Sequence, residues 1–283
     1  MASPFSDLLQ TDPGLGLLRL AALMAEEETE PDDETLDAME AQVQAGVLAG
    51  HAASDMWPEL ISGLMARTPS NMIYAMRESG ALDEILPEVA GLFGVPQISD
   101  DPAEVDLGDH LMNALDEAAK RHAPLAVRFA LLVMNVGKID SPPEHLPVHY
   151  RHMERGRPRI EAICGRFCAP ADCRDLALLA LTECERVHRA SEVRAGPVAA
   201  MLERLGAFDN PDRFGRFMEL CASDYCAYGE RSGQDYPKAR LLTTALDACM
   251  GVQPDSRTAT SDALMMARAT AIAYAFRSAR WSD

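Results

Sequence analysis

The sequence contains few aromatic residues and no long apolar run. Phe, Trp and Tyr together make up 6% of its 283 residues, and a low aromatic content disfavours a protein built mainly of strands. No stretch approaches the ~20 apolar residues of a transmembrane helix, which argues against a membrane partner. The first residues lack the basic start and apolar centre of a signal peptide. We therefore expect a cytoplasmic protein.

The sequence also lacks a paired cysteine motif. Its seven cysteines lie between Cys164 and Cys249, and no two of them form a C-x-x-C pair. That spacing is typical of zinc sites and of thiol-redox sites. We interpret these cysteines as reduced, partly buried thiols, and on this basis no cofactor is expected.

Basic residues are scarce in the N-terminal part. Residues 1–60 hold 13 acidic residues and a single base, Arg19, within a chain of net charge −18. Such an acidic segment repels a phosphate backbone. It therefore argues against DNA as a partner.

What the sequence has in abundance is helical periodicity. Hydrophobic residues make up 48% of the chain, and Ala, Leu, Met and Glu, which favour helices, are common. Apolar residues recur every three or four positions, and no useful alternating strand pattern is present. The pattern predicts an all-α protein with helices over Leu15–Ala25, Leu36–Val47, Trp57–Met65, Met72–Met76, Asp109–Arg121, Pro124–Val136, Arg157–Cys168, Ala171–Arg189, Pro197–Leu205, Pro211–Tyr228, Pro237–Met250 and Asp262–Trp281.

Residues 91–103 contain Gly, Pro and an acidic pair, which predicts a loop or a seam between domains. We expect three regions: a neck-like helical region over 1–97, a multi-helix bundle over 98–230 and a helical tail over 231–283.

Metal-capable side chains cluster in three places. His110 lies near a predicted helix start, His149 and His152 lie in a histidine-rich loop, and Asp224 lies in a later helix. Imidazoles and a carboxylate brought together in a helical bundle can hold a divalent ion. Three histidines in one loop mark a polar surface loop more often than a metal site, and both interpretations stay open here.

The order of motifs resembles the C-terminal two-thirds of a bacterial tRNA nucleotidyltransferase, the CCA-adding enzyme, including its HD phosphohydrolase domain. The resemblance extends over some 240 residues and implies an all-α, HD-like bundle after a helical neck. It rests on Ser79-Gly-Ala-Leu, Leu86-Pro-Glu, Leu92-Phe-Gly-Val-Pro, Glu104-Val-Asp-x-Gly-x-His110, Ala126-Val-Arg-Phe-Ala130, Gly137-Lys138, Pro142-Pro-Glu, Arg174-Asp-Leu-Ala, Tyr236-Pro237 and Leu241-Leu242.

The departures from the family pattern concern the residues that carry its chemistry. The family's head, whose paired carboxylates hold two metal ions for nucleotidyl transfer, has no counterpart in this sequence. In the neck, Asp12 and Pro13 remain and Arg19 matches the middle of three arginines. Leu15 and Ala22 stand where the family has the other two arginines, and in a later segment Asp55 stands where the family has an arginine. Since a leucine offers none of the donors of an arginine, we expect no base templating.

The HD dyad is replaced by Met134-Asn135. Methionine sulfur is a poor ligand for hard divalent ions, and asparagine brings no negative charge. The resemblance implies ligand positions at His110, His149, His152 and Asp224, and a phosphate-binding position at Lys138. Cys184 stands where the family has a histidine, and His188 persists. A partial site could hold zinc or nickel, or the surviving residues could be structural relics.

A locally basic segment offers a place for RNA. Between residues 151 and 166 five arginines outnumber two glutamates, and Arg151, Arg155, Arg157 and Arg159 are the candidate phosphate contacts. A solvated helix start would have the same composition.

We therefore expect a tRNA nucleotidyltransferase-related protein with a degenerate active site, serving as a non-catalytic binding or regulatory protein with at most weak affinity for tRNA, other RNA or nucleotides. One alternative is a metal-dependent HD-type phosphohydrolase with an altered site. The other is a subunit of a split enzyme, which would receive its head from another chain through an exposed apolar face at Leu15–Ala25. Whether the protein is an enzyme stays open at this stage.

Overall fold

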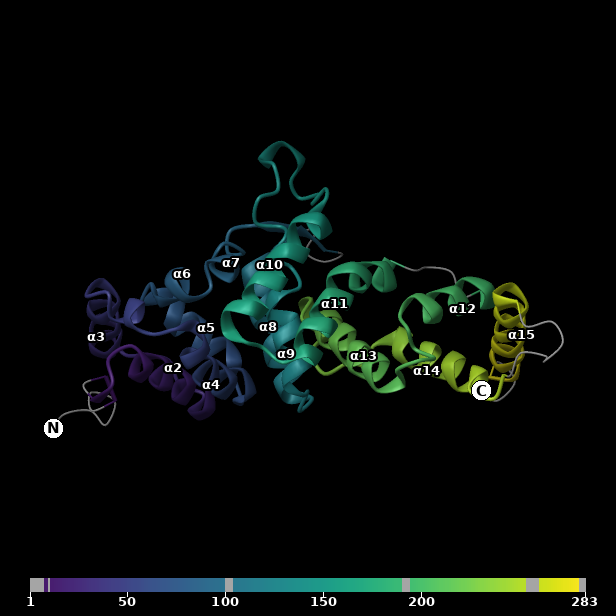
Figure 1. Cartoon of the computed structure of the whole chain (residues 1–283), viewed down its shortest axis with the longest axis horizontal. Helices are drawn as coiled ribbons and strands as arrows, with labels where there is room; N and C mark the ends of the chain where they lie inside the picture. The colour runs from purple at the N-terminus through teal and green to yellow at the C-terminus, as the bar shows by residue number, and fades with distance from the viewer. Residues whose placement is uncertain (1–7, 10, 100–103, 190–193, 253–259, 280–283) are drawn as a thin grey trace.

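The computed structural model describes residues 8, 9, 11–99, 104–189, 194–252 and 260–279. It confirms the all-α fold. The helices follow one another along an elongated molecule, from α2–α5 at one end to α12, α14 and α15 at the other (Figure 1). None of the helices in the described residues combines the length and the apolar character of a membrane span.

The N-terminal helices form the first layer: α2 (Leu15–Glu27), α3 (Asp33–Gln44), α4 (Ala53–Met65), α5 (Pro69–Glu78), α6 (Ala81–Ile85) and α7 (Pro87–Ala90). Helix α3 begins at Asp32, whose carboxylate accepts a hydrogen bond from the Thr35 amide. Helix α2 packs against α4 and α5. Leu17, Leu18 and Leu20 of α2 are fully buried. The expected exposed apolar face at Leu15–Ala25 is therefore wrong, because α4 and α5 cover it.

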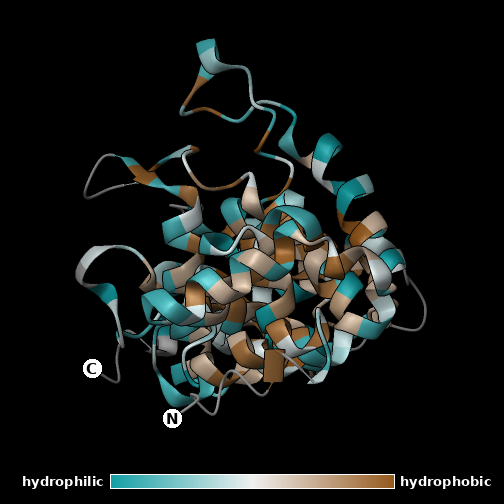
Figure 2. Cartoon of the chain, turned by 90° about the vertical axis from the view of Figure 1, so that its left-hand side faces the viewer, coloured by the Kyte–Doolittle hydropathy of each residue, from teal (hydrophilic) through white to brown (hydrophobic). Residues whose placement is uncertain are grey.

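Five helices form the central bundle: α8 (Leu107–Lys120), α9 (Leu125–Val133), α10 (His152–Phe167), α11 (Ala171–Arg189) and α13 (Pro211–Cys226). Their apolar faces meet in the interior, where Figure 2 shows the hydrophobic segments of the ribbon gathered. Helix α10 begins at His152, five residues before the predicted start. His152 therefore belongs to a helix and not to the preceding loop.

The predicted loop over 91–103 contains a strand instead. Strand β1 (Pro96–Ile98) pairs antiparallel with β2 (Glu104–Asp106). Each strand has only three residues, too few for an alternating pattern to stand out in the sequence. Asp106 ends β2 and also caps α8 by accepting a hydrogen bond from the Asp109 amide.

The C-terminal helices α12 (Ala195–Arg204), α14 (Pro237–Cys249) and α15 (Ser261–Ala279) pack on one another. Trp281, the predicted end of the last helix, lies outside the described residues. One hydrophobic core extends from Leu9 to Ile272, so the three-region division at 97 and 230 stays a prediction.

Two glycines allow the turn after α9 to touch the start of α10. A Cβ on Gly137 would lie 2.0 Å from the His152 carbonyl oxygen and 2.6 Å from the Gly156 nitrogen. These are backbone atoms of a helix, which cannot move aside singly. The close approach therefore requires glycine at residue 137.

We predict that Gly137→Ala lowers the free energy of unfolding by about 2 kcal/mol or more, because overpacking at a backbone contact forces the two segments apart. The control is Gly165→Ala, also in this part of the fold, where a Cβ meets nothing within 4 Å. Since alanine favours helix over glycine, the control should stabilise by up to about 1 kcal/mol. Denaturant titrations measure both, and equal effects would contradict the packing account.

Candidate functional site

The central bundle encloses a cavity of about 350 Å³. Helices α8, α11 and α13 supply His110, His188 and Asp224 to its lining, and the turn after α9 supplies Met134 and Asn135. The structure therefore places both residues of the altered dyad on the same cavity as two of the predicted ligand residues.

Asp224 is the centre of this cavity's polar side. Its Oδ1 lies 2.9 Å from Nε2 of His110, and its Oδ2 lies 3.0 Å from Nε2 of His188. Burial opposes ionisation of Asp224, but the two imidazoles outweigh it and hold the pKa of this carboxyl well below its usual range. Asp224 is therefore an anion whose two oxygens are both engaged.

The two histidines differ in their other contacts. His110 stacks on Tyr228, with ring centroids 4.0 Å apart, and its Nδ1 is buried without a hydrogen-bond partner among the described residues. In the tautomer of His110 that donates its Nε2–H to Asp224, Nδ1 carries a lone pair and no hydrogen. In His188, Nδ1 lies 3.1 Å from Tyr236 Oη. Burial lowers the pKa of His188, but Cys184 and Asp224 outweigh it and raise the pKa to about 10.

Lys138, the predicted phosphate-binding residue, is buried and paired. Its Nζ lies 2.8 Å from Glu185 Oε1 and donates to Gln97 Oε1 at 2.8 Å. Burial opposes ionisation of Glu185, but Lys138 outweighs it and lowers the pKa of Glu185 to about 2. A phosphate group at this position would have to compete with the Glu185 carboxylate.

His149 and His152 lie beside this pair and make other hydrogen bonds. His149 Nδ1 lies 2.8 Å from Ser141 Oγ, and its Nε2 donates to the Pro96 carbonyl at 3.0 Å. His152 Nδ1 donates to the His149 carbonyl at 2.8 Å. Of the four predicted metal ligands, the structure thus joins His110 to Asp224 and gives His149 and His152 separate partners.

The four candidate RNA-binding arginines divide into two pairs. Arg155 donates to the carbonyls of Gly137 and Tyr150, and Arg159 donates to the Val136 carbonyl and pairs with Asp140. These two arginines hold the loop between α9 and α10. Arg151 and Arg157 have side chains that are 79% and 55% exposed, and each is near only one glutamate of its own helix.

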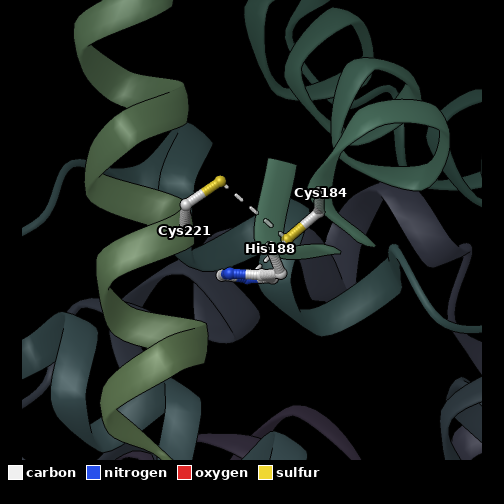
Figure 3. Close-up of side chains that lie close together, drawn as sticks. All are labelled: Cys184, His188 and Cys221. Carbon is white, nitrogen blue, oxygen red and sulfur yellow. Dashed lines mark hydrogen bonds between the residues drawn. The ribbon is translucent and has the colours of Figure 1, made fainter. Parts of the chain in front are cut away.

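A second group of metal-capable side chains joins the cavity from α11 and α13. The ligand atoms of Cys184, His188 and Cys221 all lie within 4.8 Å of one another (Figure 3). From the sequence, Cys221 is expected to be one of the reduced, partly buried thiols and not a metal ligand. The available signal was the helical spacing of Cys184 with His188 and of Cys221 with Asp224, which places each pair on one helix face.

Stability should fall at acidic pH because of the histidines beside Lys138. Burial, together with the Lys138 charge, lowers the pKa of His149 to about 4, and burial also lowers the pKa of His152. An unfolded histidine has a pKa of about 6.5. Below that pH the unfolded chain therefore binds protons at these two histidines, whereas the folded chain does not. The free energy of unfolding should therefore fall as the pH drops from about 6.5 toward about 4.

Urea titrations at several pH values measure this slope. His149→Gln should make the slope shallower, whereas His145→Gln, at an exposed position of the same loop, should leave it unchanged. An unchanged slope in the His149 variant would contradict the assignment.

Comparisons with known proteins agree with this architecture. No protein-family model matches the chain. The multifunctional CCA protein of Halorhodospira halophila is 40% identical over 253 residues, which cover 89% of this chain and 61% of that protein. The multifunctional CCA proteins of Cupriavidus necator and Burkholderia multivorans are 39% and 38% identical, over 87% and 94% of this chain. The chain spans about 60% of the length of these relatives. It is therefore a tRNA nucleotidyltransferase-related protein, homologous to part of the multifunctional CCA proteins.

Proposed function

We propose that this chain binds RNA of the tRNA type without transferring nucleotides or hydrolysing phosphoesters. The observation that carries the proposal is the pair Met134-Asn135 on the wall of the cavity. A metal-dependent hydrolase needs charged or imidazole ligands that leave one position open for water. Here the two residues offer neither a negative charge nor an imidazole.

The surrounding contacts support a non-catalytic role. Both oxygens of Asp224 are engaged by imidazoles, and Lys138 is neutralised by Glu185. A phosphate at the family's position would have to break the Lys138–Glu185 pair, which lies between a buried and a half-buried partner. Breaking a buried pair is costly because it leaves an uncompensated charge.

The RNA contact is assigned to Arg151 and Arg157. Both are exposed at the start of α10, and members of the resembled family hold tRNA along their body and tail. With a net charge of −18, the rest of the chain repels a polyanion, so the contact should be weak and sensitive to salt.

We predict that Arg151→Ala with Arg157→Ala weakens tRNA binding and flattens its salt dependence. A wild-type slope of about −2 in log affinity against log salt should become shallower by about 1 to 2, since two phosphate contacts are lost. Fluorescence anisotropy with labelled tRNA measures this slope.

The matched control is Arg67→Ala with Arg174→Ala, because these arginines are also exposed and paired with acidic residues but lie on other parts of the surface. Equal losses in both double variants would show a nonspecific charge effect. Tight binding that ignores salt would contradict the proposal.

We also predict that the 283-residue chain adds no nucleotides to tRNA. Leu15, Ala22 and Asp55 stand where the resembled family has arginines that hydrogen-bond the incoming base, and Arg19 is occupied by Asp12 and Glu59. Incubation with labelled CTP and a tRNA that lacks its terminal CCA is the measurement. Incorporation above a blank made from an identically purified empty-vector fraction would refute this part of the proposal.

A phosphohydrolase is the second candidate, and one observation favours it. The cavity of about 350 Å³ is large enough for a small ligand and is lined by two imidazoles and a carboxylate. A phosphodiesterase panel with added Mn²⁺, Ni²⁺ or Zn²⁺ discriminates the two proposals. Turnover that is lost in Asp224→Asn would favour the hydrolase.

A further inference from the structure

We propose that Cys184, His188, Cys221 and Asp224 form a closed zinc site between α11 and α13. Cys184 and His188 are four residues apart on α11, and Cys221 and Asp224 are three residues apart on α13. Both spacings place the two side chains of a pair on one face of their helix. The two helices pack against each other, so each contributes two ligands to the same point.

The distances between the ligand atoms are those of a tetrahedral site. Zinc bonds of about 2.3 Å to sulfur and about 2.0 Å to nitrogen place two sulfurs about 3.8 Å apart, and sulfur and nitrogen about 3.5 Å apart. The Sγ atoms of Cys184 and Cys221 are 3.9 Å apart, and Cys184 Sγ lies 3.3 Å from His188 Nε2 (Figure 3). These two distances match a tetrahedral site to within a few tenths of an ångström, and the ligand atoms of Cys184, His188 and Cys221 all lie within 4.8 Å of one another.

Asp224 supplies the fourth ligand. Its Oδ2 lies 3.0 Å from His188 Nε2 and 3.9 Å from Cys184 Sγ. Oxygen bonds to zinc are about 2.0–2.2 Å long, so this oxygen lies within reach of an ion held by Cys184 and His188. Four protein ligands leave no open position, which makes the site structural and unsuited to activating water.

The outer contacts of the ligands are those that zinc sites use. A zinc-bound histidine normally has a hydrogen bond at its other ring nitrogen, and His188 Nδ1 meets Tyr236 Oη at 3.1 Å. The free oxygen of Asp224 meets His110 Nε2 at 2.9 Å. Both partners orient a ligand without competing for the ion.

Zinc is favoured by the chemistry of the ligands. Two sulfurs and an imidazole suit zinc far better than magnesium or calcium, which prefer oxygen. On binding, the two thiols and the protonated His188 ring each lose a proton to the solvent, so that two thiolates and a neutral imidazole become ligands. Cys184, His188 and Asp224 border the cavity, which provides a path for the ion. This ligand set differs from the one expected from the sequence, because it contains both sulfurs and neither His149 nor His152.

The test is anaerobic titration of the reduced protein with Co²⁺ and then Zn²⁺, without RNA. We expect one Co²⁺ per chain, with the visible bands of tetrahedral cobalt and a near-ultraviolet sulfur-to-cobalt charge-transfer band. One equivalent of Zn²⁺ should bleach both. Cys221→Ser should lose about half of the charge-transfer intensity, because one of the two sulfur ligands remains, and weaken zinc binding at least tenfold in competition with a chelator.

The matched control is Cys173→Ser, which changes another buried cysteine of α11 and should keep the wild-type spectrum. Because a serine variant could fail to fold, the X-ray absorption spectrum of the zinc-loaded wild type gives an independent answer: two sulfur neighbours at about 2.3 Å. Absence of bound metal in the reduced wild type, or a first shell of nitrogen and oxygen alone, would overturn the proposal. So would a Cys184–Cys221 disulfide that forms in air even when zinc is present.

Discussion

The attachment of the N-terminal helices to the bundle depends on one buried guanidinium. Arg128 of α9 is 3% exposed. It donates to the Leu64 and Ala66 carbonyls, where α4 ends, at 2.8 and 2.9 Å, and to the Ala123 carbonyl at 2.9 Å. The last carbonyls of a helix have no partner within it. A buried carbonyl without a partner costs about 1–3 kcal/mol. Arg128 therefore holds α4 against α9 by satisfying acceptors that no apolar side chain could satisfy.

Inside the bundle, Asp224 likewise holds helices together through buried hydrogen bonds. It connects α8, through His110, to α11, through His188, and it does so with both oxygens of one carboxylate. A buried anion is tolerated only when it is paired and hydrogen-bonded. The same contacts engage both oxygens of Asp224 with imidazoles. The proposed zinc ion would keep the His110 contact and replace the His188 contact by metal coordination.

Much of the fold could be predicted because helical periodicity is a local property of the chain. The predicted helix Ala171–Arg189 agrees with α11 at both ends, and the predicted start at Pro211 agrees with α13. The short strands β1 and β2 were not predicted because three residues are too few to show an alternating hydrophobic pattern. The exposed face expected on α2 was wrong because periodicity identifies an apolar face and leaves open what covers it. The order of motifs also identified the family, and the relatives confirm it.

In the candidate site, the sequence gives the chemical type of each residue, and the tertiary structure determines which residues are in contact. The sequence by itself determined which residues carry charge, imidazole or sulfur, and that Met134-Asn135 could serve neither as a strong ligand set nor as an acid. Only the packing of α8, α11 and α13 decided that Asp224 faces His110 and His188, and that Cys221 lies 3.9 Å from Cys184. The reason is that residues 37 positions apart meet through the crossing of two helices. That crossing is fixed by the fit of many apolar side chains, and no local pattern in the sequence records it.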